Sequence, residues 1–156
     1  MGLTPEYKAG SIVDRVAAFE QSVDKAMYFV ACYEGELWAR YARDNHTYTD
    51  RTGNLTNSIG YAVAKKDKLV NSDIPGSGIS KANALKVAMR LASSCISRYT
   101  VIVVAGMNYA ASVESKGYNV ILPAELKMRA DFPKMKKLIE EKVKEKANEL
   151  FGNLKL

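Results

Sequence analysis

The one histidine of the chain, His46, lies in a polar segment between two aspartates, Asp44 and Asp50. Thr47 and Ser58 offer hydroxyl groups nearby. A histidine that is oriented by a carboxylate and faces a hydroxyl is the arrangement that activates a nucleophile. The spacing along this chain does not require such a triad. We therefore expect His46 to be a solvent-exposed loop residue and the protein not to be an enzyme, with a catalytic site around His46 as the alternative.

Metal and nucleotide motifs do not occur in the sequence. Its two cysteines, Cys32 and Cys95, and its single histidine fall short of the four ligands of a structural zinc site. The glycines of Gly76–Gly78 are not followed by the lysine of a phosphate-binding loop. The sequence predicts no cofactor and no metal site. Both cysteines have apolar neighbours at helical spacing, so we expect two buried free thiols in helices.

One acid stands out because it follows an apolar stretch. Glu114 comes directly after Val113 and closely after Tyr109 and two alanines. A catalytic acid or base needs a second convergent group, and none is identifiable here. We expect Glu114 to be a partly buried carboxylate that pairs with a cation or caps backbone amides.

The net charge and the tyrosine content indicate that the protein functions by binding through its surface. The chain has 156 residues, a formal net charge of +6 and nine tyrosines. Cations beside aromatic rings suit the stacking of nucleic-acid bases, and tyrosine is also favoured at protein interfaces. No nucleic-acid motif accompanies these residues, so we expect an interface and keep a small basic nucleic-acid-binding protein as the alternative. The tyrosines concerned are Tyr41, Tyr48, Tyr61, Tyr99, Tyr109 and Tyr118.

A long helix opens the arrangement of predicted elements. Apolar residues recur at steps of three, four or seven between Ser11 and Arg43, which predicts one α-helix about 50 Å long. Such a length in a small domain favours a partner surface outside the domain. Residues 44–50 form a predicted loop, Thr52–Ser58 a turn and Ile59–Ala64 a strand.

The middle of the chain predicts a loop, a helix and a strand. Residues 65–80 are polar and contain Pro75, which indicates a surface loop. A helix capped by Ser80 should run to about Ser97. Tyr99–Ala105 is β-branched and nearly continuous, as is typical of a central strand.

The last third predicts a short helix or turn, an edge strand and a terminal helix. We expect the short helix within Met107–Ser115 and the edge strand at Gly117–Leu122. Pro123 suits the first turn of a helix. Pro133 should end that helix or begin the next one, and Gly152 should end the last.

These elements predict an α+β fold, with a small mainly antiparallel sheet flanked by a long N-terminal helix and a C-terminal helix. We expect one domain over residues 1–156. No apolar run approaches the roughly 20 residues that cross a bilayer. Met1–Gly10 lacks the apolar core of a signal peptide. We therefore expect no contact with a membrane.

Three blocks of the sequence resemble the bacteriophage tail-completion and head–tail joining family. In that family a Thr-Gly-Asn/Asp-Leu-x-x-Ser segment follows a long first helix, and a later strand precedes a Tyr-Ala-x-x-Val-Glu run and a glycine. The matching residues here are Thr52, Gly53, Asn54, Leu55 and Ser58, then Tyr109, Ala110, Val113, Glu114 and Gly117. A third, weaker match is Leu122-Pro123-Ala124. The usual Gly-Thr after the glutamate is replaced by Ser115-Lys116-Gly117.

The resemblance implies a structural virion protein at the head–tail junction, in the neck or tail-completion region. Such a subunit is made in the host cytoplasm, forms a ring with its own copies and joins the portal-side adaptor to the tail tube or tail terminator. DNA can pass through the lumen of such a ring without being read. The long first helix and the 65–80 loop are our candidates for contacts between copies.

The matched residues also have expected roles in the fold. Gly53 permits a left-handed turn, Leu55 anchors that turn in the core, and Ser58 begins a strand. Tyr109, Ala110 and Val113 should pack a short helix on the sheet, with Glu114 fixing the turn that follows.

Overall fold

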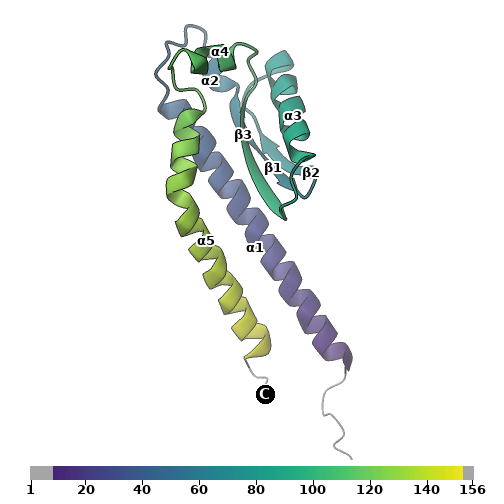
Figure 1. The fold of residues 1–156 in the computed structure, drawn as a ribbon. Helices are drawn as coiled ribbons and strands as arrows, with labels where there is room; N and C mark the ends of the chain where they lie inside the picture. Colours follow the sequence, from purple (N-terminus) through teal and green to yellow (C-terminus); the bar gives the residue numbers. More distant parts are fainter. Residues whose placement is uncertain (1–8, 153–156) are drawn as a thin grey trace, which may run out of the picture.

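The two longest helices run side by side past a small antiparallel sheet (Figure 1). A computed structural model describes residues 9–152, so most of Met1–Gly10, where we expect no signal peptide, lies outside the described residues. The elements in chain order are α1 (Ala9–Asp44), α2 (Asn54–Asn57), β1 (Ile59–Lys65), β2 (Lys68–Asp73), α3 (Gly78–Ala92), β3 (Tyr99–Ala105), α4 (Ala110–Ser115) and α5 (Leu122–Phe151). The predicted α+β class is confirmed.

The sheet lies between α1 and α3. Alternate residues of a strand point to opposite faces, so Tyr61 and Val63 of β1 face α1, whereas Ala62 and Ala64 face α3. Buried Ala84, Ala88 and Ala92 bring α3 close to the sheet. Leu91 of the same helix is exposed although it is a large apolar residue.

The central strand is β1 and not β3. The strand order is β2-β1-β3, and both pairings are antiparallel. The apolar run of Tyr99–Ala105 led us to predict a central strand there. Its residues are apolar because α1 and α3 cover both faces of the sheet, even though β3 is an edge strand.

The predicted surface loop at 65–80 contains strand β2. Its burial alternates weakly because one face is half-buried and the other is exposed. Lys66 makes the tight turn from β1 with a positive φ of 56°, a conformation for which glycine or asparagine is the usual signal. The hairpin was therefore missed. Ser80 lies inside α3 and does not cap it, because the helix begins at Gly78 after Ser77.

The end of the chain differs from prediction at two places. Gly117–Leu122 is not a strand: Gly117 has φ +86° and the segment turns into α5. Pro133 lies inside α5, which continues through it. This proline is exposed, so the carbonyl that loses its helical donor lies on the exposed side of the helix. Pro123 in the first turn and Gly152 at the end of α5 are confirmed.

Neither cysteine is fully buried, in contrast to our expectation. Both are free and half-buried. Cys32 lies in α1 as predicted, and its sulfur accepts a hydrogen bond from Asn71 at 3.0 Å. Cys95 lies beyond the end of α3, where its thiol donates to the carbonyl of Leu91.

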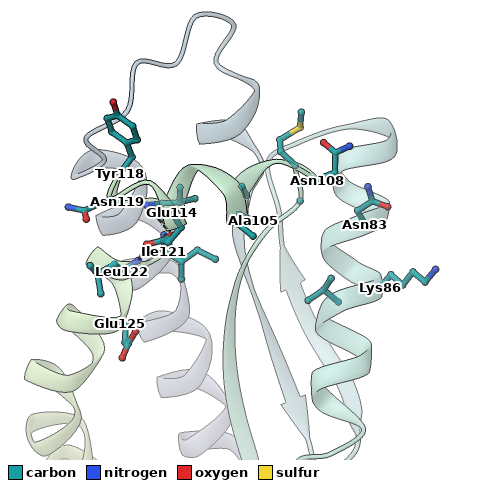
Figure 2. A pocket seen from close by; sticks show the side chains of 17 residues that line it. Asn83, Lys86, Ala105, Asn108, Glu114, Tyr118, Asn119, Ile121, Leu122 and Glu125 are labelled. Carbon is teal, nitrogen blue, oxygen red and sulfur yellow. Dashed lines mark hydrogen bonds between the residues drawn. The ribbon is translucent and has the colours of Figure 1, made fainter.

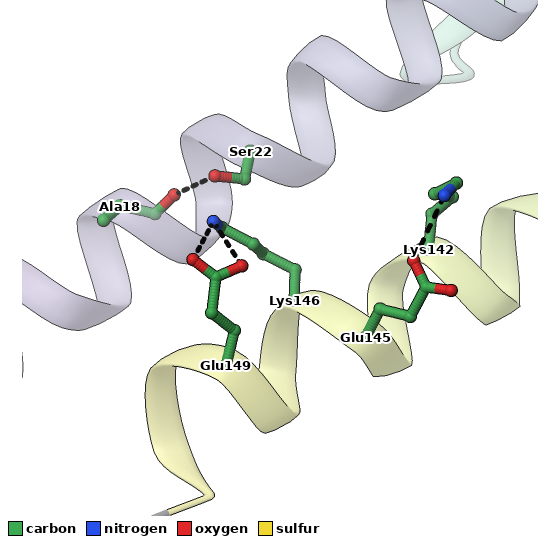
Figure 3. A network of polar contacts seen from close by, with 6 residues as sticks. All are labelled: Ala18, Ser22, Lys142, Glu145, Lys146 and Glu149. Carbon is green, nitrogen blue, oxygen red and sulfur yellow. Dashed lines mark hydrogen bonds and ion pairs between the residues drawn. The ribbon is translucent and has the colours of Figure 1, made fainter.

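Beyond the sheet, α1 and α5 continue as a two-helix arm (Figure 1). The rings of Phe19 and Phe151 meet edge to face, with centroids 5.7 Å apart. Ion pairs one turn apart lie along α5, as Figure 3 shows for Lys142 with Glu145 and Lys146 with Glu149. These exposed pairs each contribute little to stability.

Candidate functional site

The first block of matched residues forms a buried corner at the start of β1. Gly53 has φ +72°, the left-handed conformation that we predicted. Leu55 is buried as predicted, and Ser58 is buried immediately before β1. The Ser58 hydroxyl donates to the carbonyl of Leu55 at 2.7 Å, and its own carbonyl accepts from the amide of Gly106 at 3.1 Å. This corner therefore fixes the start of β1 against the end of β3.

The end of α1 is held to the same corner by side chains. The Arg43 guanidinium donates to the carbonyl of Ile59 at 2.9 Å. Asp50 accepts a hydrogen bond from the amide of Thr56 at 2.8 Å. Burial raises the pKa of Asp50, but the hydrogen bonds from Thr56 and from the backbone of Gly53 and Thr52 together outweigh it and hold that pKa below its ordinary value. The carboxylate is thus committed to the turn.

The second block caps the last helix. The Glu114 carboxylate accepts hydrogen bonds from the amides of Val120, Ile121 and Leu122 at 3.2, 2.7 and 3.1 Å (Figure 2). The first amides of a helix have no partner within the helix, and a carboxylate there is also attracted to the positive end of the helix dipole. The capping role that we predicted for Glu114 is confirmed.

Other matched residues are surface residues or packing residues. Ala110 is buried and Val113 is packed against the core, as expected. Tyr109 is exposed, so its predicted packing on the sheet is wrong. Thr52 and Asn54 are exposed, and Thr52 Oγ1 accepts from the amide of Asn54 at 3.4 Å.

The structure does not bring His46 together with a carboxylate and a hydroxyl. His46 is half-buried, which corrects the expected exposure. Its ring stacks on Tyr48 with centroids 4.3 Å apart, and Nδ1 lies 3.0 Å from the Tyr48 carbonyl oxygen. Asp50 is bonded to Thr56 instead, and Ser58 is bonded to Leu55. These groups hold the loop together.

A polar cluster that sequence reasoning missed joins α1 to α5. The Trp38 ring nitrogen donates to Asp131 at 3.3 Å, and Lys127 pairs with the same carboxylate at 2.9 Å. Nearby, Glu34 Oε2 is buried with no hydrogen-bond partner among residues 9–152. Burial and the neighbouring Asp131 raise the pKa of Glu34. No local pattern connects positions so far apart in the sequence.

A second missed cluster holds α1 to the sheet. The Asp24 carboxylate accepts from Lys65 at 2.6 Å, from Arg98 at 3.1 Å and from the Tyr99 hydroxyl at 3.0 Å. The hydrogen bond from Lys65 is the main cause that lowers the pKa of Asp24. Of the three neighbouring lysines Lys65, Lys66 and Lys68, the first is therefore neutralised within the fold.

An apolar groove of about 400 Å³ lies between α1, the start of β3 and α5. Met27 and Ala31 line it from α1, and Phe132, Met135 and Ile139 line it from α5. Phe132 is 54% exposed although it is a large apolar residue. Lys136 and Glu140 stand on the rim. The groove is thus an exposed apolar surface with a charged border.

A pair of aromatic rings is exposed elsewhere on α1. Phe29 is 69% exposed and Tyr33 is 56% exposed. Their rings stack nearly parallel, with centroids 6.4 Å apart and 10° between planes. Of the tyrosines that we expected at an interface, Tyr48 and Tyr61 are buried instead. Tyr33 was not among those expected, because its helical context hid it.

Comparisons with known proteins give no relative for this chain: no family model, no curated protein and no solved structure matches it. Within residues 9–152, no helix is both long and apolar enough to span a bilayer. The same residues contain no group of three or more histidine, cysteine, aspartate or glutamate side chains that could hold a metal ion. The described residues thus form packed helices and a sheet with exposed apolar surfaces.

Proposed function

We propose that this chain is a structural virion protein of a tailed bacteriophage. It forms a ring at the head–tail junction and joins the portal-side adaptor to the tail. The observation that supports this proposal is the structural role of the residues that resemble the family blocks. Gly53, Leu55 and Ser58 fix the start of the sheet, and Glu114 caps the last helix. Residues that hold helix ends and strand starts suit a protein whose surface does its work.

Exposed apolar groups support assembly as the activity. Phe29, Tyr33 and Phe132 are each more than half exposed, and exposed apolar patches mark interaction sites in soluble proteins. A subunit repeated around an axis needs two different surfaces that fit each other, one on each side. We place the two-helix arm (Figure 1) along that axis, where it gives the subunit its length.

Deletion of the gene from the phage genome that encodes it tests the proposal. We expect filled heads and separate tails in electron micrographs, with joined particles restored when the chain is supplied from a plasmid. Intact infectious virions from the deletion strain would overturn it. DNA gel mobility at two salt concentrations examines the nucleic-acid-binding alternative, because phosphate contacts give a steep salt dependence. We expect only weak, non-specific retardation.

A further inference from the structure

The exposed aromatic pair and the apolar groove lie on opposite sides of α1. Successive residues of an α-helix are about 100° apart, so residues two apart point in nearly opposite directions. Phe29 is two residues after Met27, and Tyr33 is two residues after Ala31. Met27, Val30 and Ala31 line the groove, and Tyr33, three residues after Val30, lies nearer the edge of the groove than Phe29 does. The Phe29 ring of one subunit therefore cannot reach its own groove.

The two surfaces also share one level along the helix axis. Trp38 of α1 bonds Asp131 of α5, and the two helices are antiparallel. Tyr33, five residues before Trp38, is therefore level with about Lys136, five residues after Asp131. By the same count Phe29 is level with about Glu140. The contact between Phe19 and Phe151 agrees with this alignment.

We infer that Phe29 and Tyr33 of one copy dock into the groove between α5 and β3 of the next copy. This inference rests on the proposed function, because it supplies the contact from which the ring is built. Rotation about an axis parallel to α1 brings pair and groove together without a shift along that axis. That is the condition for a closed ring, since a shift would build an open helix.

One pair of opposite charges lies at the far end of the contact in that arrangement. Lys25 precedes Phe29 by about one helical turn, and Glu140 on the groove rim is level with Phe29, so the Lys25 and Glu140 side chains lie about one turn apart when the copies are parallel. At the other end Glu36 already pairs with Arg40 and Arg43 of its own subunit. Lys136 also lies level with Tyr33, where an ammonium can face an aromatic ring.

Burial of the Phe29 and Tyr33 rings provides most of the binding energy of this contact. Aromatic side chains dominate interface energies when they enter a desolvated pocket. Phe132, Met135 and Ile139 offer apolar contacts on the α5 wall of the groove. A polar rim around an apolar centre is the usual anatomy of a protein interface.

Photo-crosslinking tests the contact in the full chain. A benzophenone amino acid in place of Phe29 is irradiated in an equal mixture of ¹⁴N- and ¹⁵N-labelled protein. We expect crosslinked peptides of mixed isotope content that join position 29 to Phe132–Ile139. Crosslinks to other segments of the neighbouring copy, or no crosslinks between copies, would overturn the inference.

Variants give an independent readout by sedimentation velocity. Phe29→Ser with Tyr33→Ser should weaken assembly at least tenfold, whereas Met89→Ser, at an exposed methionine of α3 on the other side of the sheet from α1, should leave it unchanged. Lys25→Glu should weaken assembly, and the added Glu140→Lys should restore it. If the double serine variant assembles as well as the wild type, the docking is overturned, even where gene deletion still blocks head–tail joining. Rings that form through this contact without a deletion phenotype refute the proposed function alone.

Discussion

Removal of the Glu114 carboxylate should loosen the start of α5. The side chain accepts hydrogen bonds from the amides of Val120, Ile121 and Leu122. A hydrogen bond to a charged group contributes about 1.5–3 kcal/mol, and loss of a helix cap costs about 0.5–2 kcal/mol. Val120 is fully buried, so water reaches its amide poorly once the carboxylate is gone. We expect Glu114→Ala to lower the free energy of unfolding by about 2–4 kcal/mol.

That loss is large enough to measure by thermal or urea denaturation followed by circular dichroism. For a chain of this size it lowers Tm by about 4–16 °C. Glu114→Gln should lower the free energy of unfolding by about half as much as Glu114→Ala. Its amide oxygen still accepts a hydrogen bond from the helix, whereas its NH₂ group faces another donor. Hydrogen exchange should show faster exchange at Val120 and Ile121 in both variants.

The matched control is Glu125→Gln in the first turn of the same helix. Glu125 is exposed and pairs with Arg129 at 2.7 Å, so its replacement should change the free energy of unfolding by less than about 0.5 kcal/mol. If Glu114→Ala falls within the same 0.5 kcal/mol, the carboxylate is not the cap that its hydrogen bonds indicate, and the reasoning fails.

Three further substitutions test other parts of the fold. Gly35→Ala should destabilise the protein by about 1–3 kcal/mol despite the helix preference of alanine, because the new Cβ would lie 2.5 Å from Cδ2 of the buried Tyr61 ring; urea denaturation measures it. Glu34→Gln should stabilise the protein at pH 7: the raised pKa of Glu34 means that ionising it costs stability as pH rises above 4.5, so the gain should vanish in urea titrations below that pH. Asp24→Asn should destabilise the protein at pH 7. Because folding lowers the pKa of Asp24, its ionised carboxylate stabilises the fold above pH 3.8, and this stabilisation is lost as the pH falls and the group is protonated. A difference in urea midpoint between variant and wild type that persists at pH 2 would contradict this.

Periodicity was sufficient to predict α1, β1, β3 and the end of α5. It failed where a contact distant in sequence decides local structure. The segment Gly117–Leu122 has the composition of a strand, but Glu114 binds the amides of its last residues and turns it into a helix start. Pro133 should break a helix, but α5 packs against α1 on both sides of it, through Asp131 and Met135.

The corner around Gly53 was predictable because its cues are local. A left-handed glycine, a buried leucine and a strand start follow one another within a few residues. The groove could not be predicted in this way. Its walls come from Met27 and Ala31 on one helix and Phe132 on another, about a hundred residues further along. Apolar spacing alone labels all of these residues as core, and only the assembled helices show that Phe132 is exposed.

The separation of scaffold from surface has a consequence for how such a subunit chooses its neighbours. The matched residues of the two blocks hold the start of β1 and the start of α5. None of them lines the groove or belongs to the aromatic pair. Substitutions at Phe29, Tyr33 or Phe132 can therefore alter partner choice without unfolding the chain, since these side chains are mostly in water. Substitutions at Leu55 or Glu114 act in the opposite way, because their side chains hold the helix and strand ends that bring α1 and α5 together. Under the proposed docking, assembly and stability should thus be separable by mutation in this protein.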